Sequence, residues 1–250
     1  MKLSNRTIVV TGGTSGIGLV FALHFLNRGN KVIVIGRNQT TLDQVTHQHP
    51  GLIGLQGDVS DANSVRGMAA FLRNRYPEVS ILFNSAGIMR AFEVMDSTLD
   101  LERTTAEIDT NLNGTIWMTE ALLPQLSKQS EAMIVTVSSG LSYVSSPIHP
   151  VYSATKAGVH MFTDTLRIQL KKSAKNIHVM ELVPPLVAGT NLESGAQSGG
   201  IPSMSLDTLL KHGIQGMEHN KRQVVPGFSK LLRFAGKYFP DTLSNAMTRG

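Results

Sequence analysis

The sequence contains no cysteine. This absence excludes disulfide bonds, thiol catalysis, thiolate zinc sites and iron–sulfur clusters for the chain. Charged residues make up only 16% of the 250 residues and 41% are hydrophobic, a composition that excludes disordered and fibrous proteins. No apolar run approaches the roughly 18 residues of a membrane-spanning helix. What remains is the composition of a single compact domain, residues 1–250.

The N-terminal segment carries no recognisable targeting signal. An apolar run at residues 7–10 is too short for the core of a secretory signal, and no small-residue cleavage pattern follows it. We therefore expect a cytoplasmic protein.

Short apolar runs alternate with longer segments of helical periodicity, a pattern typical of βαβ units. It predicts an α/β fold with a doubly wound parallel sheet and helices on both faces. The expected strands are residues 6–10, 31–35, 52–56, 81–83, 132–137, 177–183 and 223–225. The expected helices are residues 17–28, 42–47, 63–75, 102–126, 152–172, 206–218 and 228–239.

The character of the chain changes after the sixth predicted strand. Pro184 and Pro185 interrupt the chain, and residues 189–205 are rich in glycine and serine. Because loops after the carboxyl ends of the strands bind ligands in doubly wound folds, we expect residues 189–226 to form a substrate loop or lid.

The net charge of +5 originates in the C-terminal part, where seven basic and two acidic residues follow position 210. Apolar and basic residues alternate at helical spacing within residues 227–250, which predicts an amphipathic basic helix. Such a helix most often packs on its own domain or on a partner subunit, and less often contacts a membrane surface or an acidic partner. No recognition motif for nucleic acid accompanies the charge, so no nucleic-acid partner is expected.

A glycine-rich segment joins the first predicted strand to the first predicted helix. Glycines at such a place allow a tight turn and let the helix N-terminus approach a pyrophosphate. A simple turn is the alternative, but the position between strand and helix favours dinucleotide binding. The segment reads Thr11-Gly12-Gly13-Thr14-Ser15-Gly16-Ile17-Gly18.

The end of the second predicted strand indicates which dinucleotide is bound. NAD-binding folds usually carry an acidic residue there, which accepts a hydrogen bond from the ribose 2′-hydroxyl. Here the strand ends Ile35-Gly36-Arg37-Asn38, and a guanidinium can bind a 2′-phosphate that a carboxylate would repel. We therefore expect NADP(H) in preference to NAD(H), with Ser15, Arg37 and Asn38 around the phosphate, although a solvated arginine is the alternative.

Two further segments fit the cofactor end of the sheet. Asp58 and Val59 follow the third strand, where a carboxylate can accept from the adenine amino group, although a helix cap through Ser60 or Asp61 is nearly as common. After the fourth strand, the small residues of Asn84-Ser85-Ala86-Gly87 suit close approach to the adenosine ribose.

Tyr152 and Lys156 lie four residues apart, on one face of a predicted helix. A nearby ammonium stabilises phenolate, so we expect the pKa of Tyr152 to move toward the working range, more so beside an oxidised nicotinamide. Ser139 follows the fifth strand and can orient a substrate oxygen. Asn111 stands inside a helical stretch, where a local kink would let its side-chain amide hold a relay water. A surface Tyr–Lys pair is the alternative.

These motifs resemble the short-chain dehydrogenase/reductase family over roughly residues 5–190. The glycine segment resembles its TGxxxGxG motif, Asp58 its adenine carboxylate, residues 84–87 its NNAG motif, and Asn111, Ser139, Tyr152 and Lys156 its catalytic tetrad. The resemblance implies a Rossmann fold, NAD(P)(H), and hydride exchange with a carbonyl or alcohol carbon. It implies Tyr152 as acid/base, Lys156 as its modulator and ribose ligand, Ser139 as substrate ligand and Asn111 as holder of the relay water. It also implies homodimers or homotetramers through helices 102–126 and 152–172.

Three features depart from the family pattern. Ser85 replaces the second asparagine of NNAG, the usual PG-x-[VI]-x-T motif becomes Pro184-Pro185-Leu186-Val187-Ala188-Gly189-Thr190, and the glycine-rich C-terminal ending is absent. The resemblance still implies that Pro184, Val187 and Thr190 contact the cofactor. The proline pair and the tail are similar to the oxidoreductases encoded with Gram-positive teichoic acid D-alanylation genes.

The expected substrate is a small carbonyl or alcohol compound whose identity the sequence does not give. Its pocket is expected from residues 88–90, 141–149 and 189–205. Met89, Leu141 and Val144 would make it apolar, and Arg90 or His149 would receive an acidic group. A nucleotide-sensing or scaffold protein without catalysis is the alternative function; the presence of Tyr152 and Lys156 argues against it.

Overall fold

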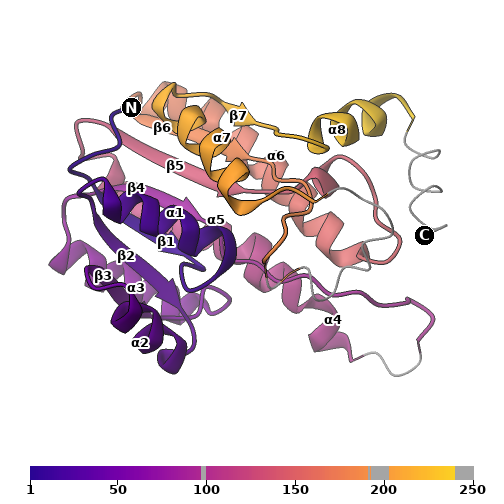
Figure 1. Ribbon diagram of the computed structural model, residues 1–250, viewed down its shortest axis with the longest axis horizontal. Helices are drawn as coiled ribbons and strands as arrows, with labels where there is room; N and C mark the ends of the chain where they lie inside the picture. The colour runs from indigo at the N-terminus through magenta and orange to yellow at the C-terminus, as the bar shows by residue number, and fades with distance from the viewer. Residues whose placement is uncertain (97–99, 191, 193–202, 240–250) are drawn as a thin grey trace.

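The computed structural model describes residues 1–96, 100–190, 192 and 203–239. Seven parallel strands form one sheet in the order β3-β2-β1-β4-β5-β6-β7 (Figure 1). The strands are β1 (Thr7–Thr11), β2 (Lys31–Gly36), β3 (Leu52–Gln56), β4 (Val79–Asn84), β5 (Ala132–Val137), β6 (Ile177–Leu182) and β7 (Gln223–Val224). The predicted doubly wound sheet is confirmed.

Helices cover both faces of the sheet (Figure 1). They are α1 (Gly16–Asn27), α2 (Gln39–Gln48), α3 (Ala62–Arg75), α4 (Leu101–Glu107), α5 (Gly114–Leu126), α6 (Pro150–Ser173), α7 (Leu206–Glu218) and α8 (Ser229–Tyr238). Among the described residues, no helix is long and apolar enough to span a membrane.

The sheet separates two hydrophobic cores because successive residues of a strand face opposite sides. Ile8 and Val10 of β1 pack into the core under α1 and α7, whereas Val9 between them packs into the core under α3, α5 and α6. All five residues of β1 are buried. Burial on both faces explains why the strands are nearly continuous runs of Val, Ile and Leu.

One expected helix differs from the prediction. The segment expected as a single helix over residues 102–126 is α4, then a π-helical turn at Ile108–Asn113, then α5. A π-helical turn inserts an extra residue into the helical repeat and is frequent at functional sites. The kink predicted at Asn111 is therefore confirmed.

The C-terminal helix α8 packs on its own domain. Leu232 is buried, and a Cβ at Gly140 would lie 2.6 Å from its Cδ1 atom. The opposite side of α8 carries Leu231, Phe234 and Tyr238, which are 51%, 57% and 55% exposed. Residues 191, 193–202 and 240–250 lie outside the described residues, so most of the glycine- and serine-rich segment 189–205 of the expected lid is not described.

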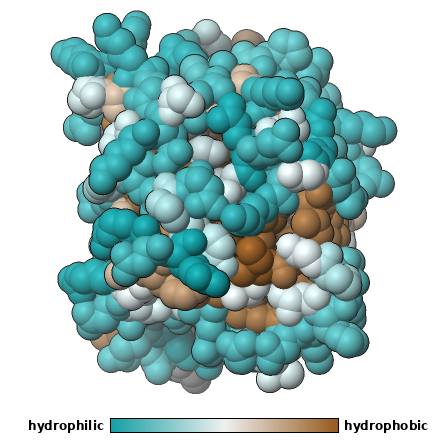
Figure 2. Space-filling model, turned by 90° about the vertical axis from the view of Figure 1, so that its left-hand side faces the viewer, coloured by the Kyte–Doolittle hydropathy of each residue, from teal (hydrophilic) through white to brown (hydrophobic). Residues whose placement is uncertain are grey.

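The strand order reverses between β1 and β4, which both pair with their neighbours in parallel. The carboxyl ends of the strands point to the right in Figure 1. Figure 2 shows the opposite end, which is mostly hydrophilic with its hydrophobic residues gathered in one patch. In doubly wound sheets the ligand crevice opens beyond the carboxyl ends, at the point of reversal.

Candidate active site

The residues expected to carry chemistry gather at the carboxyl edge of the sheet. The glycine segment follows β1, Asn84 ends β4, Ser139 follows β5 and Pro184 follows β6. Segments far apart in the sequence thus meet at the edge where such folds bind ligands.

Close packing explains the glycines after β1. Gly12 has a φ of +63°, and a Cβ there would lie 2.8 Å from the Cα of Ala86. A Cβ at Gly18 would collide with the backbone of Gly12. The loop therefore lies directly against the end of β4 and leads into α1, as a pyrophosphate cradle requires. The predicted cofactor residues Gly12, Thr14, Ser15, Gly16, Ile17 and Gly18 all lie in this turn or in the start of α1.

Thr11, which the sequence reasoning left without a role, joins β1 to the segment after β4. Its hydroxyl accepts hydrogen bonds from the backbone N–H groups of Ser85 and Ala86, both at 3.1 Å. Asn84 Nδ2 donates to Thr119 Oγ1 of α5 at 3.0 Å. Position 85 contacts Thr11 through its backbone N–H group. The serine that replaces the usual asparagine there therefore leaves this contact in place.

The end of β2 presents a cation to solvent. Arg37 is exposed directly after this strand. Asn38 caps α2, because its Oδ1 atom accepts a hydrogen bond from Thr41 N at 3.0 Å. The cap uses only the side-chain oxygen of Asn38 and leaves its amide nitrogen as a donor. The contacts of Ser15, Arg37 and Asn38 to a 2′-phosphate stay predictions.

Asp58 is engaged within its own turn. Its Oδ1 atom accepts from the backbone N–H and the hydroxyl of Ser60, at 2.9 and 2.6 Å. Asp61 caps α3, as the alternative interpretation of this segment expected. Val59 is buried against Gly114 at the start of α5. The adenine contacts of Asp58 and Val59 stay predictions.

Tyr152, Ser139 and Lys156 come together beyond β5. Tyr152 and Lys156 are buried in α6, with the Lys156 Nζ atom 5.6 Å from the centre of the Tyr152 ring. The Ser139 side chain lies near enough to the Tyr152 phenol to lower the pKa of that phenol. Lys156 Nζ also donates to Val137 O at 2.9 Å. A surface Tyr–Lys pair is thereby excluded, since both side chains are inside the protein.

The expected pKa of Tyr152 is wrong for the protein by itself. Burial raises the pKa of Tyr152 to about 12, the nearby Ser139 side chain lowers it, and the charge of Glu107 raises it. Burial likewise lowers the pKa of Lys156 to about 8. Desolvation disfavours both charged forms and is the largest cause of both shifts.

Asn111 clamps the segment after β4. Its Oδ1 atom accepts from Ile88 N at 2.8 Å, and its Nδ2 atom donates to Ile88 O at 2.9 Å and to Thr155 Oγ1 at 3.1 Å. A Cβ at Gly87 would lie 3.3 Å from Asn111 Oδ1 and 3.5 Å from Lys156 Nζ. Both amide hydrogens of Asn111 already form hydrogen bonds. Its role as holder of a relay water stays a prediction, in which the water would donate a hydrogen bond to an oxygen atom of Asn111.

Glu107 is a site residue that sequence reasoning missed. It is 0% exposed, and its Oε1 atom accepts from Arg90 N at 2.9 Å. Its Oε2 atom is buried without a hydrogen-bond partner in the described part of the chain. Burial raises the pKa of Glu107, and the charge of Lys156 lowers it. Glu107 lies four residues before Asn111, and this spacing alone could have indicated that both side chains face the site. A glutamate in a helix normally faces solvent, however, so the sequence did not predict its burial.

The segment after β6 returns to the glycine loop. Pro184 O accepts from Gly140 N at 2.9 Å, and Thr190 Oγ1 donates to Val187 O at 3.0 Å. A Cβ at Gly16 would lie 3.5 Å from Thr190 Cγ2. Thr190 therefore faces the start of α1 despite its shifted place in the motif.

One expected substrate-pocket residue, Val144, lies elsewhere, and two others, Arg90 and His149, have polar partners within the protein. Val144 is buried against α8, where a Cβ at Gly236 would lie 2.8 Å from its Cγ1 atom, so its expected place in the pocket is wrong. The guanidinium of Arg90 donates to Arg103 O at 2.6 Å. His149 is buried with Nδ1 3.2 Å from Ser146 Oγ. Met89 and Leu141 are half-buried and remain candidates.

Comparison with curated proteins gives relatives along the whole chain. The "Uncharacterized oxidoreductase DltE" of Bacillus subtilis (strain 168) is 33% identical over 249 residues, 99% of this chain and 98% of the relative. The "Dehydrogenase/reductase SDR family member 7B" of Rattus norvegicus is 32% identical over 204 residues, 78% of this chain and 61% of the rat protein.

Comparison with solved structures supports the same fold. A short chain dehydrogenase from Burkholderia cenocepacia J2315, solved in complex with NADP, superposes with a TM-score of 0.84 and covers 99% of both chains at 22% identity. A short chain dehydrogenase/reductase from Burkholderia phymatum in complex with NAD superposes with a TM-score of 0.81, covering 95% of both chains at 19% identity.

The expected family resemblance is confirmed by a match to the family model described as "short chain dehydrogenase" over residues 6–199. This chain belongs to the short-chain dehydrogenase/reductase family of oxidoreductases.

Proposed function

We propose that this oxidoreductase uses NADP(H) and exchanges a hydride between nicotinamide C4 and the carbon of a carbonyl or secondary alcohol. The observation that carries the proposal is the buried cluster of Ser139, Tyr152 and Lys156, with the Lys156 Nζ atom 5.6 Å from the centre of the Tyr152 ring. The glycine cradle after β1 and the exposed Arg37 after β2 fit the cofactor.

In the reductive direction, Ser139 and Tyr152 hydrogen-bond the substrate oxygen and hold the carbonyl in place. A nicotinamide cofactor held at the glycine segment after β1 would supply the hydride, with both of its electrons, to the substrate carbon. Tyr152 gives its phenolic proton to the oxygen, and Lys156 stabilises the phenolate that results. In the oxidative direction the phenolate takes the proton back. Because burial raises the pKa of Tyr152 to about 12, the phenol carries its proton at neutral pH, and stabilisation of the phenolate by Lys156 favours transfer of that proton to the substrate oxygen.

Replacing Tyr152 with phenylalanine tests the acid/base role. The Tyr152→Phe change keeps the ring in α6 and removes the proton, so kcat is expected to fall about 10²- to 10⁴-fold while cofactor binding is retained. Steady-state turnover on a panel of carbonyl compounds and titration of NADPH by fluorescence measure the two effects. Tyr76→Phe, at the end of α3, is the matched control. Unchanged turnover in Tyr152→Phe would refute the assignment.

The buried Glu107 is expected to influence the pH dependence of catalysis. Its negative charge raises the pKa of Tyr152, and that of Lys156. Glu107→Gln removes this charge at nearly the same volume, so phenolate forms more easily and the limb of the pH–rate profile that reports Tyr152 moves to lower pH. Glu102→Gln, an exposed glutamate of the same helix, is the control and keeps the wild-type profile. A limb that stays in place or moves to higher pH would contradict the role.

The cofactor preference depends on Arg37. We expect the wild type to have a higher kcat/KM with NADPH than with NADH. Arg37→Ala is expected to lower kcat/KM for NADPH about tenfold to a hundredfold, because a charge-assisted contact to the 2′-phosphate is lost, and to change the value for NADH little. Arg73→Ala, an exposed arginine of α3, is the control. A wild type that prefers NADH would end the proposal.

We also propose that the protein forms a homodimer or homotetramer through α5 and α6. Met161 and Ile168, seven residues apart on one face of α6, are 65% and 62% exposed. Burying such a face would stabilise an assembly. Light scattering at several concentrations measures the state, and Met161→Glu combined with Ile168→Glu is expected to give monomers. A wild-type monomer at every concentration would refute the pairing.

A further inference from the structure

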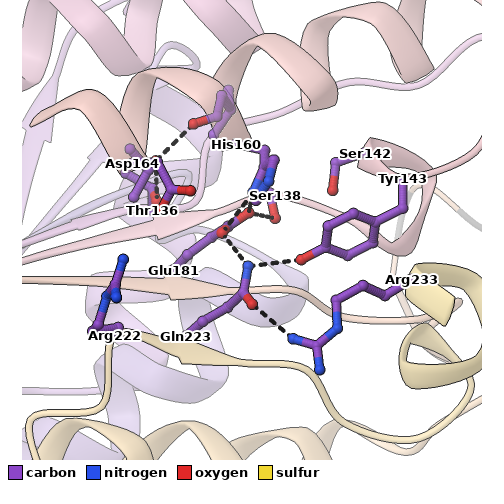
Figure 3. Close-up of polar contacts among 12 residues, drawn as sticks. Thr136, Ser138, Ser142, Tyr143, His160, Asp164, Glu181, Arg222, Gln223 and Arg233 are labelled. Carbon is purple, nitrogen blue, oxygen red and sulfur yellow. Dashed lines mark hydrogen bonds and ion pairs between the residues drawn. The ribbon is translucent and has the colours of Figure 1, made fainter. Parts of the chain in front are cut away.

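A charged hollow lies between α6, β7 and α8, outside the catalytic site. It has a volume of about 590 Å³. Figure 3 shows several of the residues that line it. Its lining contains none of the four tetrad residues. The lining residues are Tyr143, His160, Asp164, Arg167, Lys221, Arg222, Gln223 and Arg233.

The lining carries an excess of positive charge. Asp164 is its single carboxylate, and it is ion-paired with Arg167. Arg167 is further fixed by donating to Val179 O at 3.1 Å and to Arg222 O at 2.9 Å. In the part of the chain that the structure describes, the other three cations, Lys221, Arg222 and Arg233, form no ion pair. Their charges therefore face the hollow uncompensated.

A second carboxylate lies behind the wall of the hollow and is compensated from inside. Glu181 is fully buried and accepts hydrogen bonds from Ser138 Oγ at 2.5 Å and Gln223 Nε2 at 2.6 Å. Its Oε2 atom also lies 2.9 Å from Nδ1 of His160, and the carboxylate raises the pKa of that imidazole. The raised pKa favours the protonated imidazole, whose positive charge compensates the carboxylate of Glu181.

This buried network holds one cation in place. Gln223 Nε2 donates to both Tyr143 Oη, at 2.7 Å, and Glu181, which orients its Oε1 atom toward α8 (Figure 3). Arg233 NH1 donates to this oxygen at 3.0 Å. The guanidinium of Arg233 is thus fixed before any ligand arrives, which lowers the entropic cost of binding.

We propose that this hollow binds a phosphate-bearing anion. Two guanidinium groups and an ammonium around one cavity match the charge and the several acceptor oxygens of a phosphate ester or pyrophosphate. Asp164 does not oppose the ligand because Arg167 neutralises it. The cavity is large enough for a ligand of metabolite size.

The phosphate has two possible sources, a soluble metabolite or the headgroup of an anionic lipid. The second source follows from α8, which presents Leu231, Phe234 and Tyr238 to solvent beside Lys230, Arg233 and Lys237. An amphipathic basic helix of this kind is suited to an anionic membrane surface.

Calorimetric titration of the full-length protein with inorganic pyrophosphate, at constant ionic strength, tests the site. Lys221→Gln combined with Arg222→Gln changes only exposed side chains, so the fold is retained, and binding is expected to weaken at least about tenfold. Arg233→Gln is a second variant with the same expectation. Arg73→Gln combined with Arg75→Gln removes two charges from α3 and is expected to bind like the wild type.

Sedimentation with vesicles of phosphatidylglycerol or of phosphatidylcholine identifies the source. The variants Lys221→Gln with Arg222→Gln, and Arg233→Gln, are called the pocket variants. A soluble ligand is supported if the pocket variants lose pyrophosphate binding and the wild type sediments with neither kind of vesicle. A lipid headgroup is supported if the wild type sediments with phosphatidylglycerol vesicles but not with phosphatidylcholine vesicles, and the pocket variants do not sediment. The proposal is overturned if the wild type binds neither probe, or if the pocket and α3 variants bind equally well.

Discussion

The paired hydrogen bonds between the Asn111 side chain and the backbone of Ile88 hold the catalytic half of the molecule together. They are possible because the segment between α4 and α5 forms a π-helical turn, in which the Asn111 side chain is buried. The third bond, to Thr155, ties the same amide to α6. The loop after β4, the kinked helix and the helix of Tyr152 are thereby fixed relative to one another by a single side chain, and the geometry of the site depends on it.

The fold was readable from the sequence because a sheet buried on both faces imposes runs of Val and Ile, and helices between them impose their own period. The glycine loop and the tetrad were readable because their spacing in the chain is fixed by that fold. The raised pKa of Tyr152 could not be predicted in this way. Residue spacing reveals a neighbouring charge, but it does not reveal that the phenol is buried away from water. Glu107 and Glu181 were missed for a related reason: a carboxylate is assumed to be solvated until the partners that surround it are known.

The two buried glutamates illustrate different solutions to the cost of burying charge. Glu181 is surrounded by three partners, the Ser138 hydroxyl, the Gln223 amide and the His160 imidazole, so it remains a stable part of the wall between β6 and α6. Glu107 has one backbone donor and an unpartnered oxygen, so its ionisation is opposed by its surroundings. The first arrangement resists change, whereas the second makes the electrostatic state of the catalytic site sensitive to a single proton.

The packing of Leu232 of α8 against Gly140 has a consequence for the order of assembly. Gly140 lies beside Ser139, in the short turn after β5, and α8 follows the last strand of the sheet. During synthesis on the ribosome, all seven strands therefore emerge before the residues of α8 that cover this turn. The sheet can form its strand pairs while the catalytic turn still lacks its cover, and that turn is completed only when α8 has left the exit tunnel.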